Sequence, residues 1–90
     1  MIINENDKHY GEYIKLTEQS DFQLLRSIRS YEKNLYEHKD KILNPNKYID
    51  DWLELPNDNK NGTILYWEKE IESFKIKLEL AKTVANERGL

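Results

Sequence analysis

The sequence contains no cysteine, and this absence removes two ways of stabilising a small protein. Disulfide bonds are excluded, and so are metal sites built on thiolates. Ninety residues form a single domain with a modest hydrophobic core. Domains of this size are often supplemented by disulfides, by metals or by association with another chain. Association is therefore the supplement that we expect.

Long apolar runs and an excess of positive charge are also missing. No stretch approaches the ~20 apolar residues of a membrane-spanning helix, and the acidic N-terminus is unlike a signal peptide. The formal net charge is −3 at pH 7, which gives no general attraction to nucleic acid. We therefore expect a protein of the bacterial host cytoplasm that binds neither membranes nor nucleic acid.

Groupings typical of catalysis or metal binding are scarce as well. The three glycines are isolated, so no glycine-rich phosphate loop is present. His9 and His38 are the only histidines and lack the spacing of metal ligands, which favours a structural role for His38. Glu68, Glu70 and Glu72 are two residues apart, so on a helix their side chains point in different directions and cannot converge on one cation. We expect no metal, no cofactor and no enzymatic activity.

The clearest positive pattern is an amphipathic helix over residues 63–88. Thr63 is a favourable N-cap, and the preceding Asn-Gly pair predicts a polar loop over residues 57–62. Gly89 is a typical helix terminator. Apolar or small residues recur at gaps of three and four, as on one helix face: Ile64, Trp67, Ile71, Phe74, Leu78, Ala81 and Ala85.

A second long helix is predicted over residues 21–43. Ser20 and Gln23 have the spacing of a capping box at its start. Its apolar face has the same alternation of gaps as the later helix: Leu24, Ile28, Tyr31, Leu35, His38 and Ile42. The matched lengths predict an antiparallel pair.

The remaining segments complete an all-α fold. Asn44-Pro45 and the apolar spacing after it predict a short helix over residues 45–54, in which Trp52 covers one end of the core. Residues 1–19 have no clean period and are interpreted as an N-terminal arm. We predict an antiparallel hairpin of two long helices, with a short connecting helix and this arm, in one domain that oligomerises.

The closing helix has a second apolar row at spacings of four, formed by Ile76, Leu80 and Val84. A two-helix pair leaves this row in water unless something else covers it. The N-terminal arm and a second copy of the chain are equally acceptable partners. We take the row as a candidate homo-oligomer interface.

Arg26 and Arg29 form a compact basic cluster on the first long helix, with Tyr13 and Lys15 upstream in the arm. Guanidinium donors beside an aromatic ring suit the phosphate and base of a nucleotide. The alternative interpretation is a solvated helix face on which Arg29 and its neighbours pair with glutamates.

Residues spread over most of the chain resemble a family of small phage proteins. The stretches are Tyr13-Ile-Lys-Leu16-Thr17, Leu24-Leu25-Arg-Ser-Ile28-Arg29, Trp67 and Leu78-Glu-Leu80-Ala-Lys-Thr-Val84-Ala85. The family is that of the anti-CBASS sponges, which sequester cyclic oligonucleotide signals of bacterial defence. The resemblance implies a helical homo-oligomer that binds cyclic dinucleotides between protomers. It also implies that Tyr13 stacks on a base and that Lys15, Thr17 and Arg29 contact phosphates. This sequence departs from the family pattern at one position: the residue after the tyrosine is usually an arginine, and here it is Ile14.

A second resemblance covers residues 38–84. His38-Lys-Asp-Lys-Ile42-Leu-Asn44-Pro45, Trp52, Gly62 and Trp67-Glu-Lys-Glu-Ile71-Glu-Ser-Phe74 are similar to a helical hairpin near the C-termini of Rhs-type polymorphic toxins. This resemblance implies a module that binds a protein partner, such as an immunity, adaptor or toxin-associated domain. The two resemblances lead to two hypotheses: sequestration of a cyclic nucleotide, or binding of a protein without any nucleotide ligand.

Overall fold

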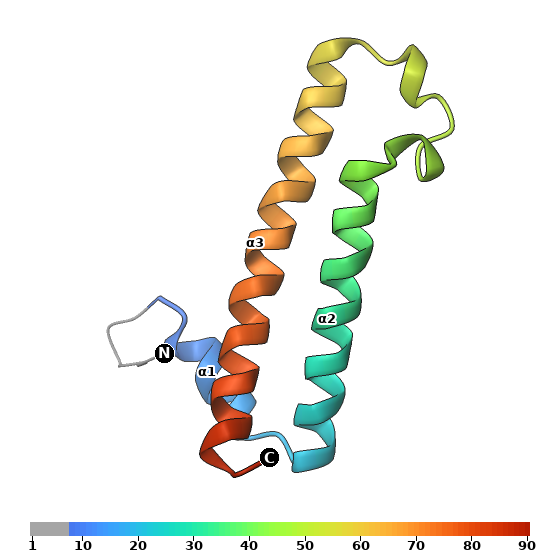
Figure 1. Ribbon diagram of the computed structural model, residues 1–90. Coiled ribbons are helices and arrows are strands. Elements are labelled where there is room, and N and C mark those ends of the chain that lie inside the picture. Colours follow the sequence, from blue (N-terminus) through green and yellow to red (C-terminus); the bar gives the residue numbers. More distant parts are fainter. Residues whose placement is uncertain (1–7) are drawn as a thin grey trace.

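The computed structural model describes residues 8–90, and its regular secondary structure is entirely helical (Figure 1). The all-α prediction is confirmed. Three α-helices are present in this part of the chain: α1 (Tyr10–Thr17), α2 (Asp21–Leu43) and α3 (Asn57–Glu87). Two short 3-10 helices, η1 (Pro45–Lys47) and η2 (Trp52–Glu54), lie between α2 and α3. Residues 1–7 of the predicted arm lie outside the described residues.

Figure 1 shows α2 and α3 side by side, with the chain running in opposite directions along them, and α1 beside the last turns of α3. The predicted capping box is present at the start of α2. The backbone N–H of Gln23 donates to the Ser20 hydroxyl at 3.2 Å, and the backbone N–H of Ser20 donates to Gln23 Oε1 at 3.0 Å. Two otherwise unpaired backbone donors are thereby satisfied.

The start of α3 differs from the prediction. The helix begins at Asn57, so residues 57–62 form its first turns and not a loop. Pro56 is the N-cap residue, and its carbonyl accepts from the backbone N–H of Lys60 at 3.1 Å. Thr63 is therefore an interior residue, and its hydroxyl donates to the Asn59 carbonyl at 2.9 Å. Extending an existing helix backwards requires less ordering per hydrogen bond than starting one, which offsets the weak helix propensity of asparagine and glycine.

This correction leads to a prediction at Gly62. A Cβ built there meets no atom within 4 Å, and its φ lies outside the left-handed region. We expect Gly62→Ala to raise the free energy of unfolding by about 0.8 kcal/mol, because alanine loses less backbone freedom in a helix. Urea denaturation followed by circular dichroism measures the change. Gly89→Ala is the control and should destabilise, because Gly89 has a φ of +74°. A destabilised Gly62→Ala variant would contradict a helical start at Asn57.

The connector is also corrected, because it contains two separate 3-10 turns and not one helix over residues 45–54. Three donors draw the chain after α2 back onto its last turn: the Tyr48 hydroxyl, the Lys47 ammonium and the Asn44 amide all bind the Asp40 carboxylate. They lower the pKa of Asp40 to about 2, with the Tyr48 bond as the largest cause. This folding back interrupts the helical path between η1 and η2.

Trp52 anchors the second half of the connector. Its side chain is buried and stacks on Trp67 of α3, with the ring centroids 6.0 Å apart and the planes 22° apart. Trp52 therefore covers the connector end of the α2–α3 pair.

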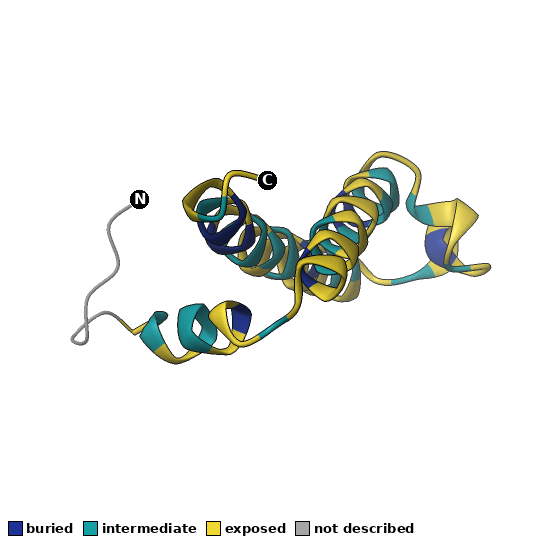
Figure 2. Ribbon diagram, turned by 90° about the horizontal axis from the view of Figure 1, so that it is seen from below, coloured by how far each residue is buried: buried dark blue, intermediate teal, exposed yellow. Residues whose placement is uncertain are grey.

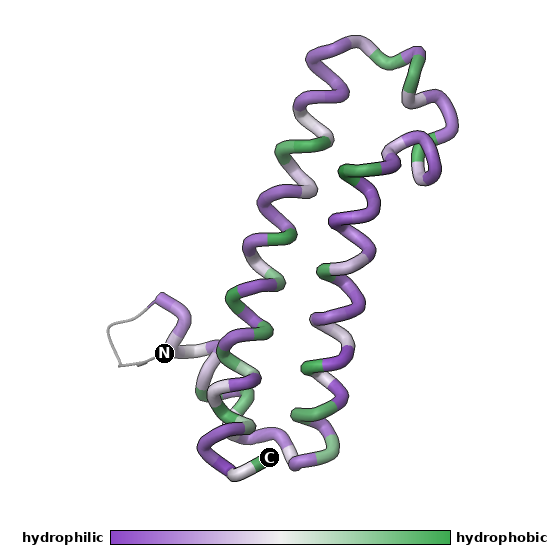
Figure 3. Tube along the Cα trace, in the orientation of Figure 1, coloured by the Kyte–Doolittle hydropathy of each residue, from purple (hydrophilic) through white to green (hydrophobic). Residues whose placement is uncertain are grey.

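The largest buried cluster lies at the opposite end, where α1 meets α2 and α3. Its members are Leu16 of α1, Leu24 of α2 and the α3 residues Leu80, Ala81, Val84 and Ala85. Figure 2 shows buried residues near the C-terminus and at the end of the first helix. In Figure 3, hydrophobic residues recur along both long helices between hydrophilic stretches.

This cluster corrects the predicted oligomer interface. Leu80 and Val84 are 0% and 2% exposed within a single chain, so neither offers surface to a second copy. Ile76 is partly buried against the same cluster. The N-terminal segment supplies the cover, because Leu16 of α1 is a member of the cluster. Any interface between copies must use another face.

Candidate functional site

Of the basic residues singled out in the sequence, Arg26 lies in a polar groove. The groove opens where the turn between α1 and α2 meets the first turns of α2. The side chains that line it are all polar and include no carboxylate: Gln19, Gln23, Arg26, Ser27 and Ser30. A groove with a guanidinium and no acidic side chain favours an anionic ligand.

Two amides of the groove are oriented by bonds to their oxygen atoms. Gln19 Oε1 accepts from the Ser27 hydroxyl at 3.1 Å, and Gln23 Oε1 accepts from the backbone N–H of Ser20 at 3.0 Å. With each oxygen used in this way, the amide nitrogens keep their N–H donors for another partner. Together with the guanidinium of Arg26, they place donors on three of the five lining side chains, whereas the Ser27 hydroxyl donates to Gln19 and offers acceptor lone pairs. The set of three donors is the arrangement that a phosphate group requires.

Arg29 does not line this groove. It follows Arg26 by three residues and lies on the exposed outer face of α2. Phe22, 72% exposed, comes four residues before Arg26, and residues at this spacing are neighbours on a helix. The aromatic ring that accompanies the two arginines on α2 is therefore Phe22.

None of the three candidates in the arm is among the side chains that line the groove. The Tyr13 hydroxyl donates to the Glu87 carboxylate at 2.9 and 3.0 Å, a bond that raises the pKa of Tyr13. The Thr17 hydroxyl donates to the Ile14 carbonyl at 2.7 Å. Lys15 is exposed on α1. A single chain thus does not bring Tyr13, Lys15 and Thr17 together with Arg26 in one pocket.

Arg88 holds together the region beside the groove, where the end of α1, the start of α2 and the end of α3 meet. The sequence did not reveal this role. Its Nη1 lies 3.0 Å from Asp21 Oδ1, and its Nη2 donates to the Thr17 carbonyl at 2.9 Å and to the Leu16 carbonyl at 3.4 Å. One guanidinium therefore joins the end of α3 to the end of α1 and the start of α2. A cation at a helix C-terminus is also favoured by the helix dipole.

His38 has the structural role that the sequence favours. Its Nδ1 bonds to the Asn34 carbonyl at 2.8 Å, and its Nε2 bonds to the Glu70 carboxylate on α3. Both ring nitrogens are therefore engaged, one with the backbone of α2 itself and one with a side chain of α3. The Tyr66 hydrogen bond lowers the pKa of Glu70, and His38 adds to this effect. These contacts join α2 to α3 in the middle of the molecule.

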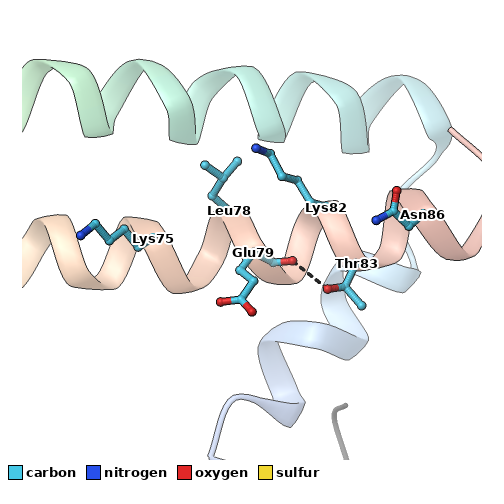
Figure 4. Close-up of a pocket in the computed structure, with 6 residues that line it drawn as sticks. All are labelled: Lys75, Leu78, Glu79, Lys82, Thr83 and Asn86. Atoms are coloured by element: carbon cyan, nitrogen blue, oxygen red, sulfur yellow. Dashed lines mark hydrogen bonds between the residues drawn. The ribbon is translucent and has the colours of Figure 1, made fainter. Parts of the chain in front are cut away.

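A second hollow lies along α3, and Figure 4 shows its six lining residues: Lys75, Leu78, Glu79, Lys82, Thr83 and Asn86. The Thr83 hydroxyl already donates to the Glu79 carbonyl at 2.9 Å. The Glu79 carboxylate also lines this hollow, and its charge opposes an anion there. The groove at Arg26 is therefore the better anion site of the two.

Two further features are absent from residues 8–90. No three histidine, aspartate or glutamate side chains in this range are grouped so that they could hold a metal ion. None of the helices in the same range is both long and apolar enough to cross a membrane. Comparison of the chain with protein-family models, with curated proteins and with solved structures found no match.

Proposed function

We propose that this chain is a non-enzymatic helical binding protein that sequesters a small anionic ligand of the cyclic-nucleotide class. In this proposal α2 and α3 form an antiparallel hairpin, and the hairpins associate into a homo-oligomer. The observation that carries the proposal is the groove lined by Gln19, Gln23 and Arg26, in which two oriented amide nitrogens and a guanidinium present donors. The resemblance to phage sponge proteins supports the same ligand class and a setting in bacterial conflict.

The chemistry of a cyclic dinucleotide matches this groove. Each phosphodiester carries one negative charge and two non-bridging oxygens, which accept hydrogen bonds from a guanidinium in a bidentate arrangement. The bases need a flat apolar partner for stacking. The exposed ring of Phe22 lies one helical turn from Arg26 and supplies such a surface.

Binding without chemical change fits the lining of the groove. Cleavage of a phosphodiester by side chains requires a general base and a group that stabilises the developing charge. Neither a histidine nor a carboxylate lines the groove. The described part of the chain holds one buried histidine, His38, which is paired with Glu70 between the long helices.

A titration with cyclic dinucleotides tests the ligand class. We expect Arg26→Ala to weaken binding by roughly 10- to 100-fold, because a hydrogen bond to a charged group contributes about 1.5–3 kcal/mol. Isothermal titration calorimetry measures both affinities. Lys69→Ala is the matched control, since it removes one exposed positive charge from α3 and should bind normally. Equal affinities for the Arg26→Ala and wild-type proteins would contradict the proposed site.

A second candidate function is the binding of a protein partner, as the resemblance to toxin-associated hairpins implies. Exposed apolar side chains at the connector end favour it: Leu53 is 78% exposed, Tyr66 60% and Leu65 52%. If this candidate is correct, calorimetric titration with any nucleotide should show no heat of binding. It also predicts a specific protein partner whose binding Leu53→Glu abolishes.

A further inference from the structure

The outer face of α2 carries an unpartnered apolar stripe. Phe22, Leu25, Tyr36 and Leu43 are 72%, 38%, 74% and 78% exposed. With the charged residues between them, they follow the alternating gaps of three and four of a coiled-coil seam: Phe22, Leu25, Arg29, Glu32, Tyr36, Lys39 and Leu43. The stripe spans roughly 32 Å of helix at 1.5 Å per residue. It is separate from the α2 face that packs on α3.

We propose that a second copy of this chain docks on this stripe, with the two α2 helices antiparallel about a two-fold axis. Antiparallel seams oppose the first apolar position of a heptad on one helix to the second on the other. One register opposes Leu25 to the partner subunit's Tyr36 and Arg29 to the partner subunit's Glu32. The same register opposes Phe22 to the partner subunit's Lys39, a cation–π arrangement. The two-fold axis repeats every pair, so residues 22–39 of the stripe are complementary to themselves, and Leu43 lies beyond the paired segment.

The charges at the seam positions themselves favour this register over its neighbours, although it also brings Arg26 beside the partner subunit's Lys33. A shift of one heptad in one direction opposes Arg29 to the partner subunit's Lys39, which places like charges together. A shift in the other direction opposes Phe22 to the partner subunit's Glu32 and Leu25 to the partner subunit's Arg29. Opposing charges across an interface fix register, whereas like charges there cost several kcal/mol. Only the first register pairs both charged positions at the centre of the stripe.

This arrangement also deepens the proposed function, and in this respect it rests on that proposal. Arg26 lies at the edge of the stripe, between the seam and the donor groove. In the selected register it comes beside the partner subunit's Lys33. Two cations that meet at an interface repel each other unless an anion lies between them. The second copy thus completes the anion site with a lysine, and a bound phosphodiester should strengthen the dimer.

Charge exchange tests the interface. We expect Arg29→Glu and Glu32→Arg, each alone, to raise the dissociation constant of the dimer by roughly 100-fold, because each places like charges opposite each other twice. The double variant Arg29→Glu/Glu32→Arg should restore the wild-type dissociation constant. Sedimentation equilibrium measures all four proteins without ligand, with circular dichroism as the check on folding. Lys69→Glu is the control for an exposed charge reversal and should leave the dimer unchanged.

A wild-type chain that sediments as a monomer at 10.9 kDa would overturn the interface, as would a double variant no tighter than the single ones. These results are independent of the ligand. A dimer that obeys the charge exchange but binds no cyclic dinucleotide would leave the interface standing and remove the proposed function. For the shared site, Lys33→Ala should weaken nucleotide binding at least tenfold. An unchanged affinity would remove the partner's lysine from the site.

Discussion

Replacement of Leu80 by alanine is expected to lower the free energy of unfolding by about 3 kcal/mol, within the range for leucine in a core. Leu80 is 0% exposed and belongs to the cluster in which Leu16 of α1 and Leu24 of α2 meet α3. Its truncation removes transfer free energy and leaves a cavity that three helices border. Urea denaturation followed by circular dichroism at 222 nm measures the loss.

Leu65→Ala is the matched control for Leu80→Ala. It makes the same substitution on the same helix, at a side chain that is 52% exposed. We expect a loss of less than about 1 kcal/mol, because less apolar surface leaves water there on folding. If the two variants are equally stable, Leu80 is not buried at the junction of the three helices.

Replacement of Trp67 by alanine is expected to cost about 3 kcal/mol and to release the connector. Trp67 is buried and stacks on Trp52, and Lys41 lies over its ring at 6.0 Å from the centroid. Removal of the ring leaves Trp52 without its aromatic partner and exposes it to water. Chemical denaturation measures the stability, and the emission maximum of the remaining Trp52 should move to longer wavelength.

Trp67→Phe controls for the loss of an aromatic ring. Phenylalanine keeps part of the stacking surface, so this variant should lose less stability than Trp67→Ala and keep the Trp52 emission closer to that of a buried indole. Trp52 emission that is unchanged in Trp67→Ala would contradict the packing of the connector on α3.

The two long helices were accessible to sequence reasoning because each has a face that repeats at the helical period. Ser20 and Gln23 also revealed the start of α2, since a capping box is a local pattern. Dependence on local patterns also explains why the start of α3 was predicted wrongly. Asn61-Gly62 is a local break signal, and the continuation of a helix through it depends on the structure on both sides. The connector was missed because its path depends on Asp40, in the preceding helix.

The candidate site was predicted only in part. Arg26 was singled out as a basic residue near the arm, and it does line a groove. Gln19 and Gln23 were not recognised as ligand-binding candidates. The sequence does not show that their amide oxygens accept hydrogen bonds within the chain, and it is this that leaves the amide nitrogens for a ligand. The resemblance implies that Tyr13 stacks on a base, and this stays a prediction; the bond from its hydroxyl to Glu87, 74 residues away in the sequence, could not be foreseen from local spacing. Arg88 bonds to residues 67 to 72 positions away, which no local spacing reveals.

The most direct test of sequestration is to saturate the protein with a cyclic dinucleotide, denature it and identify the released ligand by mass spectrometry. We expect the nucleotide to be retained through gel filtration and recovered with its mass unchanged after prolonged incubation. A protein that retains no nucleotide, or that releases a linearised or shortened one, would contradict this account.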